Sequence, residues 1–124
     1  MKALSPVALL GELIRIPSVN PEGEPGVDEP GEARLAGYLE KLLTGLGAET
    51  SLREVLPGRP NAVARFPSDR AGKPRLLLAP HTDTVSVAGM TIDPFGGDEC
   101  EGKVWGRGAS DTKGPMASML CALS

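Results

Sequence analysis

The sequence predicts an α/β fold, with a mixed, largely parallel sheet and helices on both of its faces. Two amphipathic helical segments come before the strand candidates, and residues 75–79 (RLLLA) are almost continuously apolar. Such a run suits a strand that is buried on both faces in the centre of an α/β sheet. The length of 124 residues suits one domain, and 40% hydrophobic residues suffice for a core.

The first helix is expected directly after Ser5. A serine followed by Pro6 is typical of a helix N-cap with proline at the first helical position. Val7, Leu10 and Ile14 then recur at helical spacing. Residues 20–31, rich in proline, glycine and acidic side chains, predict a loop.

The second helix is expected over residues 32–46, and Gly47 is a plausible residue to end it. One face of this helix carries a leucine stripe, formed by Leu35, Leu39, Leu42 and Leu46. Strands are expected at residues 49–55, 61–66 and 75–79. In the second of these, Ala62, Ala64 and Phe66 alternate with Val63 and Arg65.

Residues 80–108 predict a long loop region, with one short strand at residues 104–105. A last helix is expected over residues 113–124, with Met116, Met119, Leu120 and Leu123 on one face. The chain stops inside this helix, so we expect a truncated chain.

Composition excludes several classes of function. The net charge is −3 and the basic residues are scattered singly, so we expect no binding to nucleic acid. We expect no membrane span, because no apolar run approaches the roughly 20 residues that a span needs. The apolar start is interrupted by polar residues and predicts a helix rather than a signal peptide. Two cysteines form no disulfide framework, which favours a cytoplasmic location.

The single histidine follows the apolar run, in the sequence RLLLAPHTDTV. Ligands in open α/β sheets gather outside the carboxyl ends of strands. In an extended backbone His81 and Asp83 point the same way, and a carboxylate behind an imidazole is the usual partner of a metal-bound histidine. The alternative interpretation is a surface histidine with an acidic neighbour.

A second candidate site is VWGRGASDTKG, where two glycines precede Asp111. A dinucleotide fingerprint would need glycine where Asp111 stands, and the spacing from Gly108 to Lys113 does not match a phosphate-binding loop. Two interpretations stay open. Asp111 is a metal ligand, able to bridge two cations about 3.5–4 Å apart, or it is the N-cap of the last helix. We expect Arg107 and Lys113 on the surface rather than facing substrate carboxylates.

Taken together, the two sites and their surroundings resemble the zinc aminoacylase and carboxypeptidase family, which includes acetylornithine deacetylase, succinyl-diaminopimelate desuccinylase and glutamate carboxypeptidase. The resemblance covers nearly the whole chain. It rests on IRIPSVNP, RLLLAPHTDTV, DPFGGDECEGKVWGRGASDTKG and the order of the helices around them. Pro80, Ser86 and Thr112 depart from the family's usual residues, but none of these replaces a ligand.

The resemblance implies a role for each site residue. His81 would be a terminal ligand to one metal and Asp111 the carboxylate that bridges two metals. Asp83 would be the catalytic-site acid that orients His81. It also implies two Zn²⁺ ions in a complete active site, or Co²⁺ in their place, and a cis peptide bond after Asp111.

For the complete protein, the resemblance implies hydrolysis of the amide bond of N-acyl amino acids or small peptides, in a homodimer. Residues 1–124 would form the N-terminal portion of an incomplete zinc-peptidase-like catalytic domain, without the lid and dimerisation domain. The family's acidic pair would lie beyond Ser124, so we expect the isolated chain to be inactive. The alternative function is that of a non-catalytic fragment, acting as an interaction module or as half of a split enzyme.

Overall fold

The computed structural model describes residues 4–23, 31–69 and 71–124. A kinked turn, Ala109–Lys113, comes directly before the last helix. Residues 24–30 of the predicted loop at 20–31 lie outside the described residues. The other elements are α1 (Pro6–Ile14), the 3-10 turn Pro21–Gly23, α2 (Glu32–Gly45), β1 (Glu49–Leu56), β2 (Arg59–Arg65), β3 (Asp98–Cys100), β4 (Lys103–Trp105) and α3 (Gly114–Ala122).

Both early helices form where the sequence predicts them, and their ends show why. The Ser5 side chain accepts a hydrogen bond from the Ala8 amide, and Pro6 is the first residue of α1. Gly47 follows α2 with a φ of 92°, a left-handed conformation that favours glycine. The buried face of α1 differs in part from the expected one, because Ile14 is buried as predicted, whereas Val7 is exposed and the buried residues also include Leu9 and Leu13.

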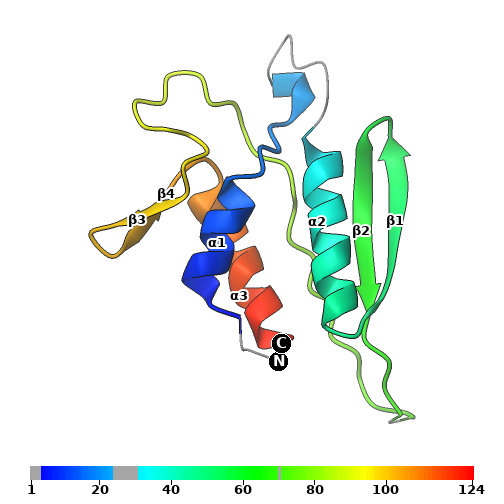
Figure 1. Cartoon of the computed structure of the whole chain (residues 1–124). Coiled ribbons are helices and arrows are strands. Elements are labelled where there is room, and N and C mark those ends of the chain that lie inside the picture. Colours follow the sequence, from blue (N-terminus) through cyan, green and yellow to red (C-terminus); the bar gives the residue numbers. More distant parts are fainter. Residues whose placement is uncertain (1–3, 24–30, 70) are drawn as a thin grey trace.

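A single core lies between the three helices. Figure 1 shows α1 beside α3, and α2 lies between this pair of helices and the hairpin formed by β1 and β2. The short hairpin of β3 and β4 projects on the far side of α1. The buried residues that form the core are Leu9, Leu13, Leu35, Leu39, Leu43, Ala48, Met116, Ala117 and Leu120.

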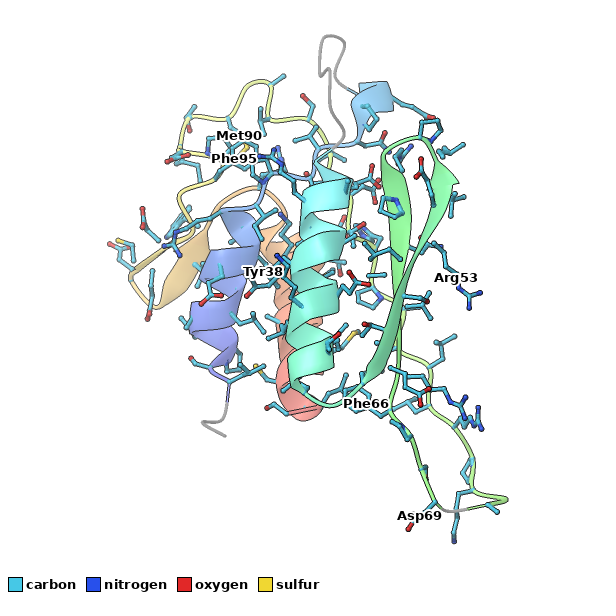
Figure 2. All side chains as sticks on the ribbon, turned by 45° about the vertical axis from the view of Figure 1, so that its right-hand side comes forward. Tyr38, Arg53, Phe66, Asp69, Met90 and Phe95 are labelled. Atoms are coloured by element: carbon cyan, nitrogen blue, oxygen red, sulfur yellow. The ribbon has the colours of Figure 1, made fainter. Side chains whose placement is uncertain are left out.

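The α/β class is confirmed, but the described sheets are small and antiparallel. β1 pairs only with β2, and β3 only with β4. Ala62 and Ala64 face the core as the alternation predicts, while Val63 points outward. Figure 2 shows Arg53 on the side of this hairpin away from α2, so one helix covers one face of the sheet. Within the described residues, the expected parallel sheet with helices on both faces is absent.

The predicted buried strand at residues 75–79 is wrong for this structure. The segment is not a strand, and Leu76 and Leu77 are 85% and 86% exposed. A central strand exists only when neighbouring strands pair with its backbone groups, and none of the described residues does so here. The one parallel pairing in the described chain is an isolated bridge between Val19 and Thr84.

A wide groove lies along this unpaired segment. Its volume is about 1020 Å³, and it is lined by residues 74–83, by β2 and by the inner sides of α2 and α3. Met119 of α3 and Leu123, directly after that helix, also line it. The apolar run therefore borders an open groove. None of the described helices is long and apolar enough to cross a membrane.

Replacing a core leucine should cost far more stability than replacing a leucine of the groove. We expect Leu13→Ala to lower the free energy of unfolding by about 2–5 kcal/mol, because Leu13 is fully buried between helices. Leu77→Ala removes the same atoms from an exposed position and should change it by less than about 0.5 kcal/mol. Urea denaturation followed by circular dichroism measures both values. Equal losses would contradict this placement of the core.

Candidate metal centre

The segment that carries His81 is fixed by residues that follow α1. The Thr84 amide donates to the Ser18 carbonyl at 2.9 Å, and the Asn20 amide donates to the Thr84 carbonyl at 2.8 Å. The buried Ser18 hydroxyl donates to the Thr82 carbonyl at 2.7 Å. These three hydrogen bonds hold residues 82–84 extended beside residues 18–20.

The His81 ring lies between two aspartates. Its Nε2 atom is 2.8 Å from Oδ1 of Asp111. Its Nδ1 atom is 2.9 Å from the carbonyl oxygen of Asp83 and 3.2 Å from Oδ1 of the same residue. The structure therefore brings together the three residues that the sequence singles out, although they come from segments 30 positions apart.

Protonated His81 is favoured by this arrangement. The hydrogen bond with Asp111 is the largest influence and raises the pKa of His81 above 6.5. Partial burial of the ring opposes this shift, while the Asp83 carbonyl and the charges of both aspartates add to it. Both ring nitrogens face oxygen acceptors, as an imidazolium requires.

The carboxylate of Asp83 has further partners. Its Oδ2 atom accepts a hydrogen bond from the Asn20 side chain at 3.0 Å and lies 4.0 Å from the Arg59 guanidinium. Arg59 donates in turn to the buried Glu32 at 2.6 Å, and this hydrogen bond raises the pKa of Arg59. Asn20, Arg59 and Glu32 are not predicted as site residues from the sequence, because nothing in their local patterns marks them as neighbours of Asp83.

Asp111 lies in a turn that needs its glycines. Gly108 has a φ of 80°, and a Cβ atom there would come within 2.7 Å of Thr84 Cγ2. A Cβ atom on Gly106 would lie 2.4 Å from Ile14 Cγ2. Both glycines let the turn approach α1 and the His81 segment closely. The peptide bond between Asp111 and Thr112 is cis, as expected from the resemblance.

The structure rules out one of the two interpretations of Asp111 and corrects the expectation for Lys113. Asp111 does not cap the last helix, because α3 begins at Gly114 with Lys113 in the cap position. Lys113 is not a surface residue. Only 1% of it is exposed, and its Nζ atom donates to the carbonyls of Leu13 and Ile16, both at 2.8 Å. Burial lowers the pKa of Lys113 to about 8.

The donor atoms present suit part of a zinc site. An imidazole nitrogen and a carboxylate oxygen are among the usual zinc ligands, and in His81 and Asp111 they meet within 2.8 Å. A catalytic zinc normally has three protein ligands. The described part of the chain contains no group of three or more His, Cys, Asp or Glu side chains arranged to hold a metal. Asp83 faces the other nitrogen of His81 and does not join Asp111.

Comparisons with known proteins identify the relatives of this chain. Residues 77–124 match the model described as Peptidase family M20/M25/M40. The chain is 38% identical over 123 residues to the succinyl-diaminopimelate desuccinylase of Cereibacter sphaeroides, and that alignment covers 96% of this chain and 29% of the relative. The corresponding desuccinylase of Parvibaculum lavamentivorans is 35% identical, with 94% and 28% covered.

Two solved structures also resemble the chain. The M20 family metallo-carboxypeptidase Sso-CP2 from Sulfolobus solfataricus gives a TM-score of 0.80 at 27% identity, with 97% of this chain and 26% of that protein covered. Human carnosine dipeptidase 1 gives a TM-score of 0.79 at 27% identity, with 95% and 27% covered. The resemblance to this peptidase family is therefore confirmed, for a chain that spans about 29% of the curated relatives it matches.

Removing the carboxylate of Asp111 should lower the pKa of His81. In Asp111→Asn the main influence that raises this pKa is lost, so the histidine should titrate at lower pH. Because the folded-state pKa is raised, the stabilisation from protonated His81 is complete below about pH 6.5 and disappears as the pH rises through that pKa.

Nuclear magnetic resonance measures this pKa directly, since the chain has one histidine. Asp69→Asn is the matched control, because Asp69 lies at the tip of the loop after Phe66, as Figure 2 shows. An unchanged His81 pKa in Asp111→Asn would disprove the pairing of these two side chains.

Proposed function

We propose that this chain provides one part of the active site of a metal-dependent hydrolase that cleaves the amide bond of N-acyl amino acids or small peptides. The observation that carries this proposal is the 2.8 Å contact between His81 Nε2 and the Asp111 carboxylate, with Asp83 at the opposite ring nitrogen. The relatives named succinyl-diaminopimelate desuccinylase favour an N-succinyl amino acid as the substrate class.

In this proposal His81 and Asp111 would be the residues of this chain that hold zinc. Asp83 would accept a hydrogen bond from Nδ1–H of His81, which leaves Nε2 free to bind the metal and fixes the orientation of the ring. Bound zinc supplies Lewis acidity, which polarises an amide carbonyl and lowers the pKa of water toward 7. Asn20 and Arg59 hold Asp83 through its second oxygen, so the orienting acid is itself kept in position.

The proposal assigns residues 1–124 to the N-terminal portion of a catalytic domain. His81 and Asp111 are fewer than the three protein ligands that a catalytic zinc needs, so other ligands and a general base would come from elsewhere in a complete enzyme.

A cytoplasmic location is also part of this proposal. The unpaired Cys100 and Cys121 support it, because free thiols persist in a reducing compartment.

A second candidate function is that of a non-catalytic partner, either an interaction module or half of a split enzyme. The exposed Leu76 and Leu77 beside the open groove favour it, because contiguous apolar surface of this kind marks binding sites. An assay of this chain alone with N-succinyl amino acids and Zn²⁺ or Co²⁺ tests whether it catalyses on its own, which neither function predicts, whereas zinc binding at His81 and Asp111 separates the two functions. We expect no turnover, and turnover would show that the chain is a complete catalyst.

Zinc binding should depend on both proposed ligands. We expect the His81 ring signals to shift with added Zn²⁺ in the unmodified chain and in Asp69→Ala. In Asp111→Ala, the loss of one of two ligands should weaken binding at least about tenfold. His81→Ala should abolish zinc binding at this site. A competition assay with a coloured zinc chelator measures the zinc affinity of each variant.

The affinity for Zn²⁺ should fall as the pH is lowered through the pKa of His81. Metal binding requires the neutral ring, so protons compete with zinc for Nε2, and the raised pKa moves this competition to higher pH. The same chelator assay between pH 5.5 and 8 measures it. An affinity that does not change over this range would argue against His81 as a ligand.

A further inference from the structure

Lys113 is the largest fully buried side chain of the described residues, and it lies two positions after Asp111. Its amine donates to the backbone carbonyls of Leu13 and Ile16 at the end of α1. The carboxyl end of a helix is the negative end of the helix dipole, so a cation is stabilised beside Leu13, in the last turn of α1, and Ile16, two residues after it. The cost of burying the amine is thereby offset by two hydrogen bonds.

The same stretch of chain also holds the His81 segment. Residues 13–20, which we call the anchor segment, contact Lys113 at Leu13 and Ile16. Further along, Ser18 and Asn20 form the hydrogen bonds to residues 82–84 described above. Both ligand-bearing segments are therefore attached to one short piece of backbone.

The position of the Asp111 carboxylate depends on the turn that carries it. The carboxylate is 84% exposed and meets His81 at the surface, so surrounding side chains do not enclose it. The turn is closed by the Lys113 amide, which donates to the Gly108 carbonyl at 2.8 Å. Lys113 thus fixes the turn twice, with its amide to Gly108 and with its amine to the anchor segment.

We infer that Lys113 is a positioning residue, which holds the carboxylate of Asp111 against His81 by fastening the Ala109–Lys113 turn to the end of α1. The effect of this positioning on metal binding rests on the function proposed above, whereas the positioning of Asp111 against His81 does not. Lys113 touches neither a substrate nor a metal in this role. It acts through the backbone that connects it to Asp111.

The test uses the metal-free chain and its single histidine. In Lys113→Met a side chain of similar length without donors replaces the amine, so the turn should loosen and the His81 Nε2 resonance should move toward its value in Asp111→Ala. Lys41→Met is the matched control, because Lys41 is exposed on α2. The ¹⁵N chemical shifts of the ring report this contact directly, and a wild-type Nε2 signal in folded Lys113→Met would overturn the inference.

A rescue experiment separates positioning from a general loss of structure. Lys113→Cys is made in a chain that also carries Cys100→Ser and Cys121→Ser, and the unfolded chain is alkylated with 2-bromoethylamine and refolded. Alkylation restores an amine at nearly the length of lysine, so the His81 signal should return to its value in the Cys100→Ser, Cys121→Ser chain. A folded, alkylated chain whose signal stays at the Asp111→Ala value would refute the role of the amine.

Zinc titration then separates this inference from the proposed function. Where the His81 signal of the unmodified chain responds to Zn²⁺, Lys113→Met should weaken binding roughly 10–100-fold, as is typical of groups that support a metal ligand. Unchanged affinity would contradict the positioning role. Where the unmodified chain shows no response, the proposed metal site fails, and the metal-free resonance of His81 alone decides the role of Lys113.

Discussion

The buried ammonium group of Lys113 connects parts of the chain that are 97 and 100 residues apart. It donates to one carbonyl in the last turn of α1 and to one just after that helix, and so joins the start of α3 to α1. The contact between α1 and α3 then places Leu9 and Leu13 with Met116 and Ala117 in one core. Burying an unpaired charge inside a small domain costs free energy, so the ammonium group of Lys113 has to stay beside these two carbonyls. These contacts of Lys113 also determine the position of the Ala109–Lys113 turn, which carries Asp111.

The features that the sequence predicts well are those set by short-range interactions. Ser5 and Gly47 mark helix ends through hydrogen bonds and backbone angles that involve only a few neighbouring residues. The alternation of Ala62 and Ala64 with Val63 is likewise determined by the pleat of one strand, together with α2, the helix that comes shortly before this hairpin in the sequence. Hydrophobic periodicity and capping residues are therefore sufficient to predict such elements.

The apolar run at residues 75–79 shows the limit of that information. Its composition indicates what environment the segment suits, namely burial on both faces, but composition does not supply that environment. Strand pairing is a contact between distant segments, and the described residues offer no strand to pair with Leu76 and Leu77. The partners of the Asp83 carboxylate could not be predicted from the sequence for the same reason, since Asn20 and Arg59 come close to Asp83 only in the folded chain.

The partners of Asp83 also determine what His81 and Asp111 can do. One Asp83 oxygen faces the Nδ1 atom of His81, while the other accepts from Asn20 and lies near Arg59. With both oxygens engaged, the carboxylate of Asp83 is turned away from the side of the ring where Asp111 lies. It can orient His81 but cannot also be a third ligand beside Asp111. A zinc ion bound at Nε2 beside Asp111 would therefore need further ligands other than Asp83.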